Sequence, residues 1–170
     1  MKKRINSKQK GSRAELELAK ILTGRFGLPF ARVGVSSGAR PKQVKLDEQA
    51  AETFTGDLIT PAGFRFSIES KSVNVNVDLL DQCALLDKFL EQAQSDAHRI
   101  GKLPMLCWKR NRKGWIAVVP LQAFRFIGEE LPAYYSRYRD WLVFRLETLL
   151  VMQSPCFWFM SAHETREVKE

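Results

Sequence analysis

The stretch GDLITPAGFRFSIESKS, residues 56–72, places two acids and a lysine in a segment whose pattern predicts paired strands. Side chains alternate between the two faces of a strand, so Glu69 and Lys71 are expected to point the same way. If the stretch folds as a hairpin around its TPAG turn, Asp57 approaches the Glu69 end of the second strand. The alternative is an exposed face that carries a cross-strand ion pair.

Two carboxylates without a nearby histidine or cysteine favour a hard, oxygen-seeking cation such as Mg²⁺ or Mn²⁺. A cation held by Asp57 and Glu69 would lower the pKa of a bound water and stabilise the departing oxygen of a phosphate ester. Lys71 would orient or activate that water, or balance negative charge on the phosphate in the transition state. The residue types therefore favour metal-dependent phosphate chemistry.

A third acid, Glu15, falls in a predicted helix over residues 13–26. Its spacing aligns it with the apolar residues of one helix face, namely Leu18, Ala19, Leu22 and Phe26. An acid on a buried face is costly unless it is paired or bound to a cation, so Glu15 is a candidate for the same site. The alternative is a capping box in which Glu15 serves only the helix start behind Ser12.

The elements that must position these residues follow from hydrophobic periodicity and turn signals. Residues 133–150 look helical or mixed, and residues 36–55 form a long loop. We expect helices over 13–26, from 79 to near 101 and over 121–127, and strands over 28–35, 56–60, 64–73, 103–109, 115–120 and 156–160. This order predicts an α/β domain with a mixed central β-sheet flanked by helices.

The overall composition favours a polyanionic partner. The 170 residues suit one domain, and the net charge of +8 favours nucleic acid over a membrane surface. A basic protein without such a partner is the alternative. Three separated cysteines argue against a disulfide framework, and two distant histidines argue against a zinc site. Without a signal peptide or a bilayer-spanning run, we expect a cytoplasmic protein of a bacterial or phage-infected cell.

Four short motifs, taken in order, resemble the PD-(D/E)XK nuclease superfamily. They are KGSRAE at 10–15, RVGVSSGAR at 32–40, GD at 56–57 and ESK at 69–71. The pattern is most similar to archaeal-type Holliday-junction resolvases and their phage relatives, over roughly residues 10–120. The resemblance implies a restriction-endonuclease-like fold. The chain departs from the pattern at Gly56, where the family has proline, in a longer loop 40–55, and in a tail 125–170 without a counterpart.

The resemblance also implies a role for each matched acid and for the lysine. Glu15, Asp57 and Glu69 would bind the metal, with Mn²⁺ able to substitute for Mg²⁺. Lys71 would be the catalytic lysine.

Three further residues match the pattern less specifically. Ser36 and Ser37 match a serine loop that lies near the site and the DNA in the family, and Ser37 is a further catalytic candidate. Gln92 matches a glutamine often found on the inward side of the long helix. For Gln92 the alternative is a surface position on that helix.

Basic residues cluster around the predicted site and in the turn between two later strands. The candidate DNA contacts are Lys10, Arg13, Arg32, Ser36, Arg40, Lys42, Lys45, Lys109, Arg110, Arg112 and Lys113. Such side chains neutralise phosphates without reading sequence, which suits a nuclease that reads DNA shape. For the cluster at 109–113 the alternative is a solvated turn. The aromatic residues Trp108, Trp115, Phe157 and Trp158 are expected in the core.

Together these features predict a Mg²⁺-dependent, structure-selective DNA endonuclease, a Holliday-junction resolvase that works as a homodimer. The alternatives are a phage-type nuclease acting on other branched, linear or packaged DNA, and a non-catalytic DNA-binding protein on a nuclease-like fold. The predicted organisation is a flexible basic arm over 1–12, a nuclease core over 13–124, and an extension over 125–170. That extension would pack on the core or form the dimer interface.

Overall fold

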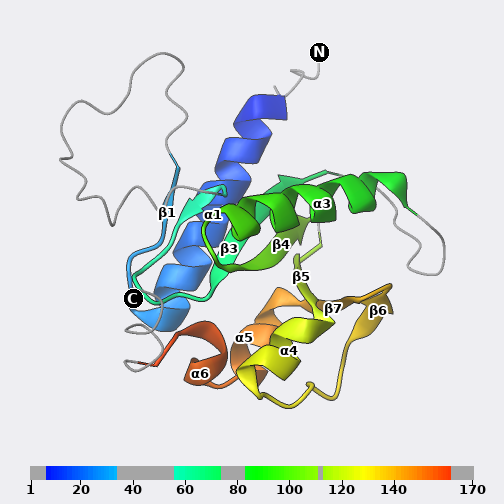
Figure 1. Ribbon diagram of the computed structural model, residues 1–170. Helices are drawn as coiled ribbons and strands as arrows, with labels where there is room; N and C mark the ends of the chain where they lie inside the picture. The colour runs from blue at the N-terminus through cyan, green and yellow to red at the C-terminus, as the bar shows by residue number, and fades with distance from the viewer. Residues whose placement is uncertain (1–6, 34–55, 74–82, 111–112, 162–170) are drawn as a thin grey trace, which may run out of the picture.

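The computed structural model describes residues 7–33, 56–73, 83–110 and 113–161 (Figure 1). In chain order the elements are α1 (Ser7–Phe26), β1 (Ala31–Arg32), β2 (Leu58–Ile59), β3 (Phe66–Ser72), α3 (Ala84–Arg99), β4 (Leu103–Lys109), β5 (Trp115–Pro120), α4 (Leu121–Ile127), β6 (Ser136–Tyr138), β7 (Trp141–Arg145), α5 (Leu146–Met152) and α6 (Pro155–Trp158). Within these ranges no helix is both long enough and apolar enough to cross a membrane.

A five-stranded mixed sheet runs through the centre of the molecule in the order β3-β4-β5-β7-β6. β3 is parallel to β4, whereas the other neighbouring strands are antiparallel. A separate two-stranded sheet joins β1 to β2. Helices lie on both faces of the large sheet, so the predicted α/β architecture with a mixed central sheet is confirmed (Figure 1).

The parallel pair of β3 and β4 requires a crossover connection, which contains α3. α3 therefore runs antiparallel to both strands. Its buried side chains recur every three or four residues, the pattern that predicted a helix here: Leu86, Leu90, Ala93 and Ala97. The crossover lays α3 along the face of β3 that carries Glu69 and Lys71.

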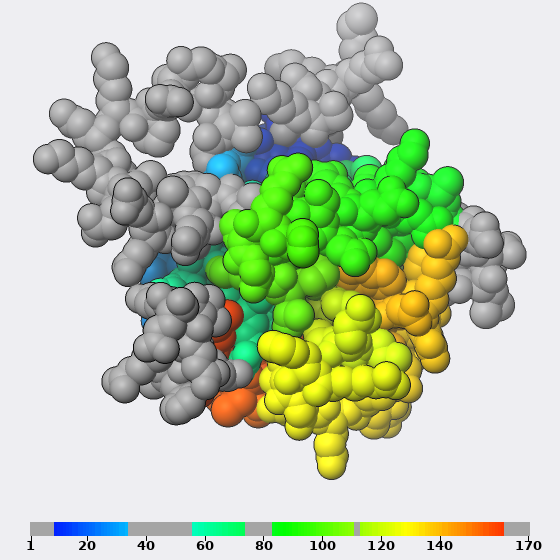
Figure 2. Space-filling view, viewed as in Figure 1, coloured from blue at the N-terminus to red at the C-terminus, as the bar shows by residue number. Residues whose placement is uncertain are grey.

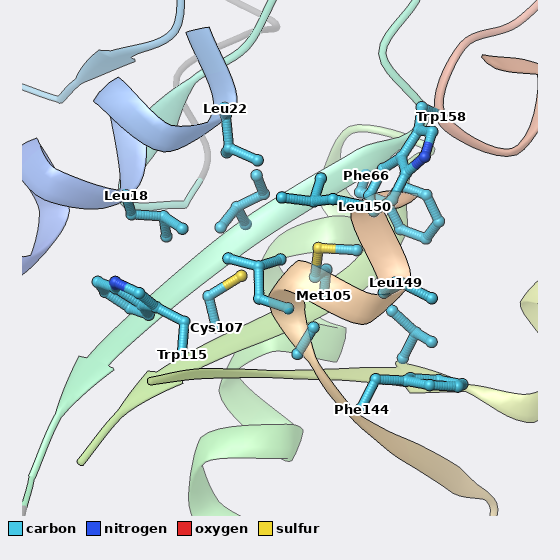
Figure 3. Close-up of a cluster of buried hydrophobic side chains, with 14 of the residues drawn as sticks. Leu18, Leu22, Phe66, Met105, Cys107, Trp115, Phe144, Leu149, Leu150 and Trp158 are labelled. Atoms are coloured by element: carbon cyan, nitrogen blue, oxygen red, sulfur yellow. The ribbon is translucent and has the colours of Figure 1, made fainter. Parts of the chain in front are cut away.

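The larger hydrophobic cluster fills the face of the sheet opposite α3. Figure 3 shows Leu18 and Leu22 of α1 on one side of this cluster and Leu149 of α5 on another. Met105 and Cys107 of β4 lie between them and are fully buried. Burial of such side chains contributes about 1.5–3 kcal/mol each, so this cluster fixes the sheet against α1 and α5.

The second hydrophobic cluster lies between α3 and the other face of the sheet. Its members come from α3, β4, β5 and β6, and they are Leu86, Leu90, Leu106, Val118 and Tyr138. In Figure 2 the surface over this face is formed by α3, in green, next to the yellow and orange segments that contain α4 and β6. α3 is therefore packed on one side and open to solvent on the other.

The C-terminal region completes the sheet. Residues 133–150, which we expected to be helical or mixed, contain β6, β7 and most of α5. β7 pairs with β5, and β6 pairs with β7 at the sheet edge. The described part of the predicted extension is thus packed on the core.

The prediction of a strand over residues 156–160 is wrong. Pro155–Trp158 forms the short helix α6, with the proline in its first turn, where a missing backbone N–H is not needed. Phe157 and Trp158 are buried as expected, and they pack on Phe66 of β3. The aromatic residues misled the strand prediction because they suit any buried segment.

Two further local predictions are wrong. α1 begins at Ser7 rather than near residue 13, so Ser12 lies inside the helix and does not cap it. Gln9 and Lys10 are good helix formers that extend α1 toward the N-terminus. The expected hairpin is also absent from the described residues, because the two-residue strand β2 pairs with β1 and not with β3.

Candidate active site

β3 carries the predicted catalytic pair on one face. Lys71 Nζ donates a hydrogen bond to Glu69 Oε1, so the two side chains point the same way, as alternation predicts. The Glu69 side chain is 2% exposed and that of Lys71 is 22% exposed. On the opposite face, Phe66 and Ile68 are fully buried and hold the strand in the core. The acid is therefore buried while the ammonium group reaches solvent.

Asp57 joins this site at the free edge of β3, although β2 and β3 do not form a hairpin. Its backbone N–H donates to the Ile68 carbonyl at 2.9 Å. Its side-chain Oδ2 accepts from the Ser70 N–H at 2.8 Å. These two bonds on either side of Glu69 fix the aspartate beside the strand.

The backbone conformation at position 56 explains why glycine stands where the motif has proline. Its φ is +98°, and a Cβ atom there would lie 2.8 Å from the Ile68 carbonyl oxygen. Proline is restricted to φ near −65° and could not adopt this conformation. Only glycine lets the chain approach β3 closely enough for Asp57 to make both of its bonds.

Glu15 lies on α1 and is half-buried, with 18% of its side chain exposed. Leu18, Ala19 and Leu22 on the same helix face are buried, which confirms the predicted inward stripe. Glu15 forms an ion pair with Arg32 of β1. Arg32, which was expected to contact DNA, therefore has a carboxylate partner in this structure.

Gln92 of α3 contacts Lys71. Its side-chain oxygen accepts a hydrogen bond from Lys71 Nζ at 3.1 Å. The residue is exposed to solvent, yet this bond turns its amide toward β3. Lys71 also lies 5.4 Å from the centre of the Phe89 ring on the same helix. The lysine is thus positioned by one strand neighbour and by two residues of α3.

Asp96 is an acid near this site that the sequence analysis missed. It lies one helical turn beyond Gln92, and α3 runs antiparallel to β3. Four helix residues span about 6 Å, and two strand residues span about 6.6 Å, so Asp96 lies level with Glu69 as Gln92 lies level with Lys71. The interval of four residues from Gln92 is the signal that could have identified it.

Burial and neighbouring charge set the protonation of the two acids on β3 and its edge. Burial raises the pKa of Asp57, while the hydrogen bond from the Ser70 N–H opposes this rise. Burial also raises the pKa of Glu69 to about 7; the charge of Asp57 adds to the rise and Lys71 opposes it. Asp96 contributes to the rise at both acids. Such a site favours binding either a proton or a cation.

The comparison with protein families gives a match over most of the chain. Residues 6–151 match the model of the family described as "Phage putative PDDEXK endonuclease". The chain belongs to this family. It is a nuclease of the PD-(D/E)XK type, as the motif order predicted.

Among solved structures, this member of the phage endonuclease family is similar to Hjc of Archaeoglobus fulgidus, titled a Holliday junction resolvase from an archaeal hyperthermophile. The identity is 19%, the alignment covers 81% of this chain and 90% of that chain, and the TM-score is 0.40. No curated protein matches the sequence.

The donor chemistry of this nuclease fits a hard divalent cation. Within the described ranges, no group of three or more histidine, cysteine, aspartate or glutamate side chains is arranged to hold a metal ion. The acids instead face cations of the chain itself, since Glu15 pairs with Arg32 and Glu69 with Lys71. Asp57 uses Oδ2 for the Ser70 bond, and its Oδ1 has no hydrogen-bond partner among those residues. A carboxylate pair of this kind suits Mg²⁺ or Mn²⁺.

The expected DNA contacts divide into separate groups in the described structure. Lys10 and Arg13 lie on the first half of α1, half-buried and exposed respectively. Lys109 pairs with Glu17 of α1, whereas Arg110 and Lys113 line a hollow beside β5. The remaining candidates lie outside the described residues: Ser36, Ser37, Arg40, Lys42, Lys45 and Arg112.

Proposed function

We propose that this nuclease uses Mg²⁺, with Mn²⁺ as a substitute, to hydrolyse phosphodiester bonds in branched DNA, and that four-way junctions are its main substrate. The observation that carries the proposal is the convergence of Asp57, Glu69 and Lys71 at the edge of β3. The order of the KGSRAE, RVGVSSGAR, GD and ESK motifs, which resembles that of junction resolvases, supports the substrate class.

Each residue of the candidate active site has a defined part in this proposal. Asp57 and Glu69 would hold the cation, with Glu15 as a third acid nearby. Bound there, the cation would supply Lewis-acid stabilisation of the phosphate oxygens and a water of lowered pKa. Lys71 lies between the buried Glu69 carboxylate and solvent, so its ammonium group can reach an incoming phosphate. Its charge would stabilise the negative charge that develops in the transition state.

The protonation of Glu69 makes this chemistry dependent on pH. Its pKa of about 7 means that the carboxylate is largely protonated in acid and ionised above neutral pH. A proton and a cation compete for the same oxygens, so the cation binds more tightly as the pH rises through 7. We therefore expect cleavage at a fixed Mg²⁺ concentration to increase over that range.

Gln92 would keep Lys71 aligned when the cation occupies Glu69. The Lys71–Glu69 bond has to loosen for Glu69 to bind a metal, whereas the Gln92 bond does not involve an acid of the site. The amide can therefore hold the ammonium group toward the substrate during cleavage.

A two-fold homodimer is part of the proposal, because a four-way junction needs two matched cuts. A phage-type nuclease acting on flaps, linear or packaged DNA is the second candidate, and the phage origin of the matched family favours it. The two candidates differ in substrate and in assembly, while they share the same active site.

The test is the cleavage of a panel of four-way junction, flap and plain duplex DNA in Mg²⁺, Mn²⁺ or EDTA. The proposal predicts metal-dependent cuts that are fastest on the junction and symmetric across it. Faster cutting of flap or duplex would favour the second candidate. DNA binding without cleavage in either metal, by folded protein, would overturn the catalytic proposal. Lys88→Ala, which removes an exposed lysine of α3 outside the site, is the control variant.

A further inference from the structure

A hollow of about 550 Å³ lies at one end of the central sheet, outside the candidate active site. Its lining comes from the segment between β4 and β5, from β5, from the end of β7 and from α5. The residues that define it are Arg110, Lys113, Trp115, Ile116, Arg145 and Glu147. Three of these side chains are cationic and one is acidic, so the hollow carries a positive excess.

The strand register places this hollow at the same end of the sheet as Lys71. Lys71 on β3 pairs with Trp108 on β4. Trp108 pairs with Ile116 on β5, which pairs in turn with Arg145 on β7. Directly paired residues form one row across the sheet, and neighbouring strands are about 4.8 Å apart. Arg145 is therefore roughly 14 Å from the catalytic lysine along that row.

The cations of the hollow are available to a ligand. Among the described residues, Arg110, Lys113 and Arg145 form no ion pair, and Lys113 and Arg145 are exposed. The Arg110 guanidinium lies 5.9 Å from the centre of the Trp108 ring, a contact that orients it. Lys109, one residue earlier, differs because it is already paired with Glu17.

We propose that this hollow binds the phosphate backbone of a DNA arm that extends from the active site. The inference rests on the proposed function and adds a substrate contact to it. Duplex DNA carries one charge per ~1.7 Å of its axis, so an arm covering roughly 14 Å presents about eight phosphates. Such an arm can place one phosphate at Lys71 and others at the hollow. Glu147 is the one acid of the lining, so the phosphates would contact the three cations around it.

Arg145 is the new element of this contact. The basic turn at 109–113 was visible in the sequence, but Arg145 is far from it along the chain and joins it only through the β5–β7 pairing. Because β7 belongs to the C-terminal region, the hollow gives that region a part in holding the substrate. It would act on affinity and on the choice of DNA shape rather than on the chemical step.

The experiment compares two double variants that each remove two positive charges. Lys113→Ala with Arg145→Ala removes two cations of the hollow. Lys20→Ala with Arg125→Ala removes two exposed cations that do not line it. Binding of a fluorescent four-way junction by the full chain is measured in EDTA across a series of salt concentrations. Thermal melting of each variant checks that it is folded.

The hollow variant should bind at least about tenfold more weakly, and its salt dependence should fall by about two ion equivalents. The control variant should bind within about twofold of the wild type. Cleavage at saturating junction in Mg²⁺ should keep its rate in the control variant. Equal salt slopes in the two variants would overturn the inference, and so would tighter binding of the wild type to duplex RNA than to DNA of the same length.

Failure of the inference and failure of the proposed function give different results. If the wild type cuts junctions but the hollow variant binds like the control, the function stands and the hollow does not bind DNA. If no DNA is cut in any metal but the hollow variant loses affinity and salt dependence, the hollow binds DNA and the catalytic proposal falls.

Discussion

Two Glu–Lys ion pairs involve strands of this sheet, and the pKa of the glutamate is raised in one pair and lowered in the other. Glu69 and Lys71 sit at the edge of β3, where the glutamate is 2% exposed and its pKa rises to about 7. Glu17 and Lys109 join α1 to the end of β4, where the glutamate is 46% exposed and its pKa is lowered. The residue types are the same, so the difference comes from burial and from the second acid, Asp57, beside the first pair.

The comparison shows which ion pair is suited to function. At Glu17 the hydrogen bond from Lys109 is the largest cause of the lowered pKa, and a hydrogen bond from Trp115 adds to it. At Glu69 the cost of burying the charge outweighs the lysine, and the site can lower that cost by binding a cation. Glu17 has no such cost to offset, because it is 46% exposed and already accepts hydrogen bonds from Lys109 and from the Trp115 ring N–H. We therefore expect substitutions in the two pairs to have opposite consequences.

The largest expected difference is catalytic. Lys71→Ala should reduce the rate of junction cleavage about 10²–10⁴-fold, because the ammonium group contacts the reacting phosphate in our proposal. Lys109→Ala should change the rate less than about threefold. Single-turnover cleavage in Mg²⁺, with enzyme in excess of junction DNA, measures both. Comparable losses in the two variants would mean that Lys71 serves the fold and not the chemistry.

The second difference is in stability without metal. The folded protein holds a proton on Glu69 that the unfolded chain loses near pH 4.5, so stability falls as the pH rises from about 4.5 through 7. Glu69→Gln stays neutral, and we expect it to stabilise the protein by roughly 2 kcal/mol near pH 8 and by much less near pH 5. Urea unfolding in EDTA at both pH values measures this effect.

Glu17→Gln should behave in the opposite way in the same urea experiment. Its pKa is lowered in the folded state, so its contribution to stability is present above about pH 4.5 and is lost as the pH falls. The pair is largely exposed, so the variant should lose less than about 1 kcal/mol near pH 8. A stabilised Glu17→Gln, or a destabilised Glu69→Gln near pH 8, would contradict the contrast between the two pairs.

A smaller effect should follow from Gln92→Ala, which removes one hydrogen bond to Lys71 and leaves both ion pairs in place. The net value of such a bond is about 1 kcal/mol, so cleavage should slow by about fivefold, with little change in junction affinity. Gln94→Ala on the same helix is the control, since Gln94 is exposed and lines a different pocket. An equal effect in both variants would show that the Gln92 hydrogen bond to Lys71 does not contribute to cleavage.

The smallest effect should come from Asp96→Asn. Its charge raises the pKa of Glu69, so removing that charge should shift the titration of Glu69 to lower pH. Carbon NMR of labelled glutamate carboxyl groups in EDTA measures the shift, with Glu17 as an internal reference that should not move. An unchanged Glu69 titration would show that Asp96 is too well solvated to act on the site.

The sequence predicted those parts of the fold that depend on local periodicity. The strands over 103–109 and 115–120 and the short helix over 121–127 have the predicted bounds. The helical spacing of α3 and the alternation at Glu69 and Lys71 could also be predicted from the sequence, because each is a property of one element. The predictions were wrong where the secondary structure or pairing of a segment depended on a partner far away in the sequence. β2 pairs with β1, and Pro155–Trp158 forms a helix that packs its aromatic residues on Phe66 of β3.

The same distinction applies to the candidate site. Motif order led to Glu15, Asp57, Glu69 and Lys71, and the structure places the last three together at β3. Arg145 was missed because nothing in its own neighbourhood marks it. Asp96 was missed because its interval of four residues from Gln92 gains meaning only when α3 packs along β3. They reach the site and the hollow through the α3 crossover and the β5–β7 pairing, which are tertiary features. Gly56 departs from the motif, and its positive φ is what brings Asp57 to the strand.

The most direct test of the account is the Mn²⁺ dependence of four-way junction cleavage by the wild type and by Asp57→Asn. The substitution keeps the size of the side chain and the oxygen that accepts from Ser70, while it removes the negative charge that a cation needs. We predict a folded variant that binds the junction with unchanged affinity in EDTA and does not cut it at any Mn²⁺ concentration that saturates the wild type. Cleavage by Asp57→Asn at the wild-type rate would contradict the proposal that the acids at the edge of β3 form a metal-dependent active site.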